Sequence, residues 1–485
     1  MSEEQERHAG LKIACMAEGG SRAGSVGVGF RSERGPILIS LMLSVGLVAI
    51  DGTVVATAVP SVVANLGGLA QFPWLFSVYL LAQAVTVPMY GKLADVFGRK
   101  PVMLFGIGMF LLGSSLCGLA WSMPALIAFR AIQGIGAGAV QPMSLTIAGD
   151  IYSIEERGKV QGYMASVWAI SAVVGPTLGG LFSQYLSWRW IFFVNVPLCL
   201  IAATVLLRNF HENVVRRSHR LDYTGGALLL VGCTLVLLGL LEGGEAWAWW
   251  SAAGIGVPLS GLVVLACFVR VQRRVSEPVL PLWIFRNRTL VTSSLVSLFV
   301  GAVLMGLTSY VPLFVQGVLG TGPLVAGFAL ATLTLGWPLT ASQSGKVYMR
   351  IGFRATALIG SALTIAGSVL ATLLSAHSTV AQVAAACFIV GAGMGLVASP
   401  TLILAQATVG WADRGVVTGN NMFSRSMGSA VGVAIFGVIA NASMGSTMDR
   451  AAIARASVHV FVAVAVVTVL MGLAVAAIPP ITKPA

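Results

Sequence analysis

The sequence GKLADVFGRK, from Gly91 to Lys100, returns in altered form as GKVYMRIGFR, from Gly345 to Arg354. Both stretches begin with Gly-Lys, carry a second glycine seven residues later and end with a basic residue. A further match, Arg157-Gly158 with Arg414-Gly415, has nearly the same separation along the chain. Matches at an almost constant offset indicate that the two halves of the chain are copies of one structural unit.

The apolar blocks on either side of these stretches are long enough to cross a membrane. Hydrophobic residues make up 57% of the 485 residues and charged residues only 9%, against about 25% charged in ordinary soluble domains. Many blocks contain about 20 residues, the length at which a helix crosses a hydrocarbon core of roughly 30 Å. The sequence therefore predicts an all-α polytopic membrane protein. We place fourteen spans, at 36–58, 74–94, 101–121, 124–147, 159–183, 189–208, 222–243, 251–271, 289–316, 323–344, 355–375, 381–406, 416–440 and 457–479.

The repeat divides these spans into two groups, because spans 1–6 and 9–14 are the two copies and spans 7 and 8 are an insertion. Two parallel six-helix repeats are typical of transporters that rock about a substrate site between their halves. We expect a cytoplasmic tail at 1–35, an N-terminal six-helix bundle at 36–208, a two-helix linker with cytoplasmic loops at 209–288, a C-terminal six-helix bundle at 289–480 and a short cytoplasmic tail at 481–485.

The distribution of basic residues predicts the orientation of the chain. Cytoplasmic loops of membrane proteins are enriched in Lys and Arg. With the N-terminus inside, every Lys and Arg falls in a cytoplasmic segment except Arg130, Arg189, Arg425, Arg450 and Arg455. We therefore expect a plasma-membrane protein with both termini in the cytoplasm. The net charge of +12 does not indicate a nucleic-acid partner, since no basic stretch alternates with base-stacking aromatic residues.

Asp51 is an acidic residue inside a predicted span, where an ionisable side chain is costly and usually functional. Arg130, in span 4, is predicted at a similar depth, roughly 10 Å from the outer end against roughly 12 Å for Asp51. The two side chains can neutralise each other, and Asp51 can also bind a proton or a cationic substrate. We expect this pair to serve the protein's function rather than its fold alone. The alternative is an ion pair that only stabilises the fold.

The loop after span 2 places Asp95 among basic residues, between two glycines that permit a tight turn. We expect an interdomain latch that opens and closes as the halves rock, formed by Gly91, Asp95, Gly98, Arg99 and Lys100. The alternative is a solvated loop of the cytoplasmic face. The second copy carries Met349 where the first carries Asp95, so a latch that depends on the acid belongs to one half only.

The stretch GPTLGG in span 5 combines close-packing glycines with a proline. Glycines four residues apart let a second helix approach, and the proline removes a backbone hydrogen bond. We expect Gly175, Pro176, Gly179 and Gly180 to help form a gate, and ordinary helix packing is the alternative.

Polar or aromatic residues elsewhere in the spans are candidates for a substrate cavity, although each could instead pack between helices: Gln133, Gln141, Tyr310, Asn421 and Arg425.

No enzymatic signature accompanies these features. There is no Walker loop, and the glycine cluster at Gly134–Gly138 follows no strand and is not a dinucleotide site. The six cysteines are scattered, and no His or Cys grouping suits a metal. We therefore expect no enzymatic activity, no cofactor and no metal, and an energy source other than ATP.

The same motifs resemble a known family. GKLADVFGRK is similar to the loop signature of the major facilitator superfamily, FRAIQGIGAG (Phe129–Gly138) to its span-4 signature and VVGPTLGG to the span-5 signature of its antiporters. IDGTVVATAVP, WRWIFFVNVP and PLFVQGVLG resemble signatures of the fourteen-helix drug/proton antiporters. The resemblance implies secondary active export, with Asp51 as the protonation site, Arg130 as its coupling partner and Asp95 in the latch.

Two departures from this family pattern concern the substrate and the protons. Ala56 stands where the pattern usually has Asn, and span 13 offers Asn420, Asn421 and Arg425 but no second acid. The missing second carboxylate disfavours dicationic substrates and favours a low number of protons per cycle. We expect a monomeric proton-driven antiporter that exports amphipathic organic compounds such as drugs, dyes or antibiotics. A dedicated exporter of one metabolite, siderophore or lipid is the alternative, and a receptor built on a transporter fold is a more distant one.

Overall fold

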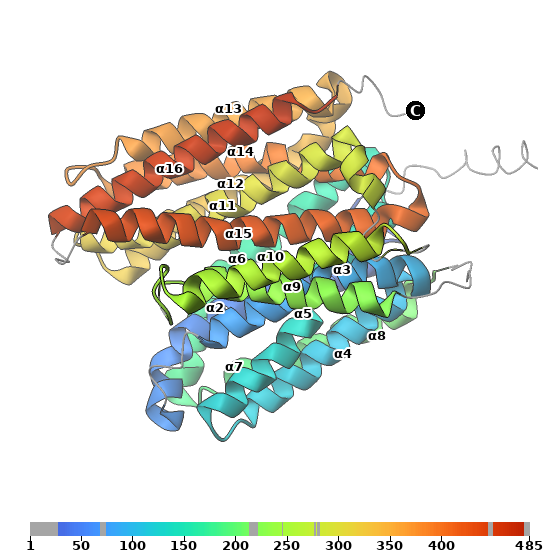
Figure 1. The fold of residues 1–485 in the computed structure, drawn as a ribbon, viewed down its shortest axis with the longest axis horizontal. Coiled ribbons are helices and arrows are strands. Elements are labelled where there is room, and N and C mark those ends of the chain that lie inside the picture. The colour runs from blue at the N-terminus through green and yellow to red at the C-terminus, as the bar shows by residue number, and fades with distance from the viewer. Residues whose placement is uncertain are drawn as a thin grey trace, which may run out of the picture.

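The computed structural model describes residues 28–67, 74–212, 222–244, 246–275, 278, 282–444 and 450–479, which form helices joined by short turns (Figure 1). The N-terminal half contains α2 (Gly35–Leu66), α3 (Trp74–Phe97), α4 (Arg99–Gly118), α5 (Met123–Ile151), α6 (Ile154–Tyr185), α7 (Trp190–Phe193) and α8 (Asn195–Asn209). Then come α9 (Tyr223–Glu242) and α10 (Ala252–Gln272). The C-terminal half contains η2 (Leu282–Arg286), α11 (Arg288–Gly317), α12 (Pro323–Ile351), α13 (Phe353–Thr372), α14 (Val380–Ala407), η3 (Trp411–Asp413), α15 (Arg414–Met444) and α16 (Arg450–Ala476).

Every predicted span is helical, with 189–208 divided into α7 and α8, and the all-α class is confirmed. Twelve helices among the described residues are long and apolar enough to cross a membrane. The two remaining predicted positions are α6, which is a 32-residue helix of lower hydropathy, and α9, whose apolar part is Thr224–Leu240. The number of fourteen crossings therefore stays a prediction.

The helices form two bundles, each with its own hydrophobic core. One core consists of buried residues from α2 to α6 and α8, and the other of buried residues from α11 to α16. Figure 1 shows the C-terminal bundle, yellow to red, lying alongside the N-terminal bundle, blue to teal. The bundles meet where α3 packs on α15 and where α6 packs on α12. The limits that we predict for the domains remain predictions.

The inserted helices lie beside this junction. α9 packs against both α3 and α15, so it touches one helix of each bundle, and α10 packs mainly on α9. A third core cluster joins them to the bundles, with Leu229 of α9 and Phe268 of α10 among its buried members.

The two glycine-containing loops have the same backbone geometry. Gly98, between α3 and α4, has φ of 97°, and Gly352, between α12 and α13, has φ of 88°. Residues with a Cβ rarely adopt such angles. The second glycine of each repeat copy is therefore needed to turn the chain directly from one helix into the next.

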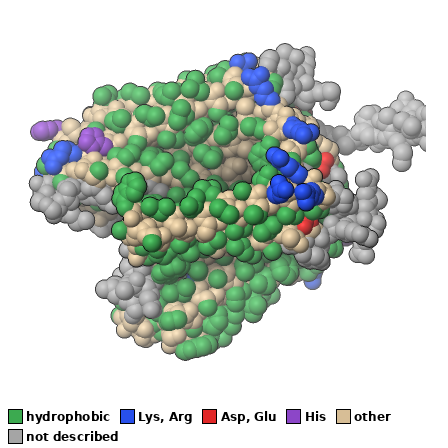
Figure 2. Space-filling view, in the orientation of Figure 1, with side chains coloured by type: hydrophobic (Ala, Val, Ile, Leu, Met, Phe, Trp, Pro, Cys, Tyr) green, Lys and Arg blue, Asp and Glu red, His purple; other side chains and the backbone are tan. Residues whose placement is uncertain are grey.

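Charged residues gather at one end of the bundles, which we call the basic end. Figure 2 shows Lys and Arg side chains concentrated toward the right-hand end of the molecule, with an apolar surface along the helices. Arg99, Arg157, Arg354 and Arg414 lie at this end, at or near the starts of α4, α6, α13 and α15. An apolar belt bordered by a basic rim is the surface expected of a protein embedded in a bilayer.

Candidate functional site

The structure brings Asp51 and Arg130 into direct contact. Asp51 lies within α2 and Arg130 within α5, and Nη1 of Arg130 is 2.6 Å from Oδ2 of Asp51. Both side chains are at most 1% exposed. Gln133, one turn along α5, donates from Nε2 to Oδ1 of Asp51 at 2.8 Å and accepts from Arg130 at 2.8 Å. Each carboxylate oxygen of Asp51 therefore has a hydrogen-bond donor.

Further groups surround this ion pair, and sequence analysis missed two of them, Tyr79 and Asn195. Arg130 donates from Nε to the carbonyl of Leu75 at 3.1 Å, and its guanidinium lies 4.1 Å from the ring centre of Tyr79 in α3. Asn195, at the start of α8, donates to Oδ1 of Asp51 at 3.4 Å and to Ser114 of α4 at 3.0 Å. Side chains from α2, α3, α4, α5 and α8 thus meet around one buried ion pair, whose own charged groups are hydrogen-bonded, as a buried pair requires.

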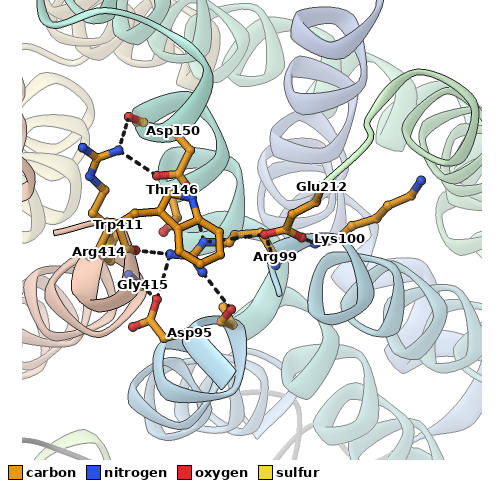
Figure 3. Close-up of polar contacts among 12 residues, drawn as sticks. Asp95, Arg99, Lys100, Thr146, Asp150, Glu212, Trp411, Arg414 and Gly415 are labelled. Carbon is orange, nitrogen blue, oxygen red and sulfur yellow. Dashed lines mark hydrogen bonds and ion pairs between the residues drawn. The ribbon is translucent and has the colours of Figure 1, made fainter. Parts of the chain in front are cut away.

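A second cluster joins the two bundles at the basic end. We call it the basic-end cluster, and it consists of Asp95, Arg99, Asp150, Trp411, Arg414 and Gly415. Figure 3 shows these residues where the two bundles meet. Asp95, near the end of α3, accepts hydrogen bonds from the backbone nitrogens of Gly415 at 2.9 Å and Val416 at 2.8 Å. These two nitrogens belong to the first turn of α15, where free N–H groups and the helix dipole favour a negative charge.

Arg99 is the centre of the basic-end cluster. Its fully buried guanidinium pairs with Asp95 at 3.0 Å and with Asp150, near the end of α5, at 3.0 Å. It also donates to the carbonyl of Trp411 in η3 and lies 3.8 Å from the centre of that indole ring. Arg414 of α15 pairs with the other oxygen of Asp150 at 2.9 Å. Asp150 therefore bridges Arg99 of the N-terminal bundle and Arg414 of the C-terminal bundle.

Lys100, another predicted latch residue, makes its contact within the N-terminal bundle and not with the C-terminal bundle. Its Nζ donates to the carbonyl of Leu207 in α8 at 3.0 Å. Glu212 accepts from the backbone nitrogens of Arg99 and Lys100, at 3.0 Å each, and so neutralises the start of α4. Sequence analysis missed Asp150, Glu212 and Trp411 because nothing in their local sequence relates them to Asp95.

Glycines allow the bundles to approach closely at two related places. A Cβ on Gly91 of α3 would lie 2.7 Å from the carbonyl oxygen of Gly415 in α15. A Cβ on Gly158 of α6 would lie 2.4 Å from the backbone nitrogen of Gly345 in α12. In each case a glycine of the Gly-Lys stretch from one repeat copy faces the Arg-Gly glycine of the other. Tyr348 of α12 adds a hydrogen bond to the carbonyl of Ile154 at the second contact.

The span-5 glycines pack within the N-terminal bundle. A Cβ on Gly175 would lie 1.9 Å from Oγ1 of Thr53 in α2, whose hydroxyl donates to the carbonyl of Ser171 at 3.0 Å. Gly179 is buried, and a Cβ on Gly180 would meet nothing within 4 Å. The side chain of Pro176 lies outside the described residues. The observed contact is therefore a close α2–α6 packing, and the gate remains a prediction.

A cavity of about 260 Å³ lies between the two bundles. The N-terminal bundle contributes α2, α5 and α6 to its wall, and the C-terminal bundle contributes α11, α12, α14 and α15. Trp168 and Trp337 line it from opposite bundles, and most of the remaining wall is aliphatic. A mostly apolar cavity with a few polar groups is typical of a site for an organic ligand.

The predicted cavity residues divide into two sets. Gln141, Asn421 and Arg425 line the cavity. Gln133 is instead buried against Asp51, and Tyr310 donates to the carbonyl of Phe436 at 3.2 Å, so neither lines it. A polar residue in a span can satisfy its hydrogen bonds within its own bundle, and the sequence does not distinguish that role from a cavity-lining one.

Two helix bundles around a central cavity, with close contacts between them at one end, are the arrangement typical of secondary transporters. The model of the Major Facilitator Superfamily matches residues 41–433, and the chain belongs to this superfamily. It is therefore a transporter rather than an enzyme.

Similar proteins support this placement. The chain is 33% identical over 421 residues to the multidrug transporter protein MdtP of Bacillus subtilis, covering 87% of this chain and 78% of the relative. It is 34% identical to multidrug resistance protein 3 of the same organism, covering 83% and 79%. The efflux pump FUS6 of Gibberella moniliformis is 33% identical, covering 84% and 74%. The solved human organic anion transporter MFSD10 (TETRAN) shares the fold, with a TM-score of 0.67 at 15% identity over 91% of this chain and 99% of that one.

Proposed function

We propose that the protein is a proton-coupled exporter of amphipathic organic compounds, such as drugs, dyes or antibiotics. The observation that carries the proposal is the buried contact between Asp51 and Arg130, inside helices that also belong to a transporter fold. Protonation of the Asp51 carboxylate would remove the negative charge that holds the Arg130 guanidinium at 2.6 Å. Proton uptake is then tied to a change in how α2 and α5 pack. The relatives named as multidrug transporters and efflux pumps support the export role.

In our proposal the basic end faces the cytoplasm of a plasma-membrane protein that has both termini there and acts as a monomer. The basic-end cluster and the α6–α12 glycine contact hold this end closed, so the cavity opens toward the outside. Protonation of Asp51 from outside weakens its contact with Arg130, and the bundles rock as the basic-end cluster separates. The proton leaves to the cytoplasm as substrate enters the cavity, and the reverse movement exports the cargo.

Each proton that crosses a membrane potential of 100 mV contributes about 2.3 kcal/mol, which is enough to drive export against a useful gradient. The test uses everted vesicles that contain the protein and hold a preformed pH gradient. A lipophilic cation, a neutral antibiotic and an organic anion are added in turn. Collapse of the gradient on addition of at least one compound, and not in vesicles without the protein, supports proton antiport. A gradient that no compound disturbs would leave a dedicated exporter of one metabolite as the better account.

A further inference from the structure

Arg425, on α15, differs from every other residue that lines the central cavity. Of the eighteen described residues in the cavity wall it alone is charged, and none is acidic. The remaining wall residues are nine aliphatic or methionine side chains, two tryptophans and six neutral polar residues. The described cavity wall therefore carries a net positive charge, although it lies within the apolar interior of a membrane protein where an uncompensated charge is costly.

The surroundings of Arg425 contrast with those of Arg130. Arg130 is fully paired with Asp51, Gln133 and the carbonyl of Leu75. Among the described residues no acid lies within ion-pair distance of Arg425 and no protein acceptor is hydrogen-bonded to its guanidinium. The nearest defined contact is the ring of Trp337 on α12, 5.1 Å from the guanidinium carbon. The side chain is partly exposed, and the space that it faces is the cavity.

Neighbouring polar groups in the wall already have partners and do not compensate Arg425. Asn421, one turn earlier on α15, accepts from Ser297 at 2.7 Å and donates to the carbonyl of Ser293 at 3.3 Å. Gln141 of α5 accepts from Gln83 at 3.1 Å. These bonds hold α15 on α11 and α5 on α3. The guanidinium is therefore the strongest unused donor in the described wall of the cavity.

We propose that Arg425 binds an acidic group of the transported molecule, and that the cargo is an amphipathic organic anion. The acidic group is a carboxylate, sulfonate or phosphate, which the fork of a guanidinium matches with two parallel hydrogen bonds. The apolar body of the same molecule contacts Trp168 and Trp337, which face the cavity from opposite bundles. This assignment rests on the proposed export function, because it names the class of substrate for the same cavity.

The low polarity of the cavity makes the contact selective. A charge-assisted hydrogen bond in a site with little water contributes more than its equivalent at a surface. A cation of the same shape meets like charge, and a neutral analogue leaves the guanidinium without its partner. We expect binding of an anion to exceed that of its neutral and cationic analogues by about tenfold to a hundredfold.

The test measures equilibrium binding to the purified full-length protein in lipid nanodiscs. The probes share one naphthyl ring and differ in charge: tritiated 1-naphthaleneacetate, 1-naphthaleneacetamide and 2-(1-naphthyl)ethylamine. Arg425→Gln removes the charge and Arg425→Lys keeps it without the planar fork. Arg189→Gln is the matched control, since it removes one Arg from the opposite end, where Arg189 donates to the carbonyl of Ala120.

We expect the wild type and Arg189→Gln to bind the acetate more tightly than the other two probes. Arg425→Lys should keep part of this preference. Arg425→Gln should lose the preference while still binding the acetamide. It is overturned if the wild type binds the amine as well as the acetate, if it binds none of the three, or if Arg425→Gln keeps the preference. Binding does not require proton coupling. A preference for the acetate combined with an unchanged pH gradient in vesicles would therefore contradict the proposed antiport and leave the role of Arg425 intact.

Discussion

Asp95 on α3 accepts a hydrogen bond of 2.9 Å from the backbone nitrogen of Gly415 on α15, although the two residues lie 320 positions apart in the chain. The bond joins the Gly-Lys stretch of the first repeat copy to the Arg-Gly pair of the second. The reciprocal contact, between α12 and α6, has the same glycine packing but Met349 in place of the acid. The two contacts at the basic end are therefore related by the repeat and differ in charge.

Replacing Asp95 with asparagine tests the charged contact. The side chain keeps its shape and one acceptor oxygen, but it loses the charge that pairs with Arg99 and the start of α15. A hydrogen bond to a charged group contributes about 1.5–3 kcal/mol, so we expect the basic end to open about 10- to 100-fold more often. Distances between spin labels placed on the two bundles at that end report this directly.

The matched control for this change is Met349→Asn, at the corresponding position of the second copy. Met349 is 41% exposed, and we expect its replacement to leave the distance distribution as in the wild type. Equal effects of the two substitutions, or no effect of Asp95→Asn, would contradict a charge-dependent closure.

Close approach of α6 to α12 predicts a second effect. In Gly158→Ala the new Cβ would lie 2.4 Å from the backbone nitrogen of Gly345, and backbone cannot move aside as a flexible side chain can. We expect the basic end to stop closing fully and the transport rate to fall by about tenfold or more. Gly327→Ala on the facing helix α12 is the control, because a Cβ there meets nothing within 4 Å. Similar transport in both variants would show that the close contact is not needed.

The turn glycines give a prediction about stability alone. Gly98→Ala and Gly352→Ala each force a side chain into a backbone conformation with positive φ and extended ψ that is essentially confined to glycine, which costs about 1–3 kcal/mol. We expect a lower thermal midpoint for both, measured by unfolding of the detergent-solubilised protein. Gly108→Ala in the middle of α4 is expected to be neutral or slightly stabilising, since the position has open space and alanine favours helix. A larger loss at Gly108 than at Gly98 would contradict this.

Variants of the buried ion pair between Asp51 and Arg130 should affect thermal stability and proton-coupled transport differently. Arg130→Gln leaves Asp51 buried without its cation, and breaking one partner of such a pair costs about 3–5 kcal/mol. The double variant Asp51→Asn with Arg130→Gln removes both charges, so we expect it to recover most of the lost thermal stability. We do not expect it to recover proton-coupled transport. Recovery of both properties would show that the pair is only structural.

Sequence patterns predicted much of the fold because bilayer thickness and the repeat constrain it strongly. Each apolar block is helical, and both Gly-Lys stretches lead into the same kind of turn. Helix ends were predicted less well. α2 continues to Leu66, eight residues past the predicted limit at 58, because hydropathy marks where the chain is apolar rather than where the helix ends.

The candidate site was predicted only in part, for a related reason. Asp51 and Arg130 are recognisable because a charge within an apolar block is rare. Asn195 and Tyr79 are neutral, and neutral polar residues in spans have many roles. Asp150 approaches Arg99 only because α4 packs on α5, which no local pattern reveals. Contacts between the bundles depend on the conformation that the transporter adopts, and a single sequence does not specify which one it is.

Proton coupling through Asp51 is the central claim, and reconstituted proteoliposomes test it most directly. An imposed pH gradient drives uptake of a substrate, and exchange of labelled for unlabelled substrate is measured without a gradient. Wild type and Asp51→Asn are compared at equal protein content. We predict that Asp51→Asn loses gradient-driven uptake and keeps exchange, because the cavity and the basic-end cluster are untouched. Gradient-driven uptake at the wild-type rate in Asp51→Asn would contradict the account.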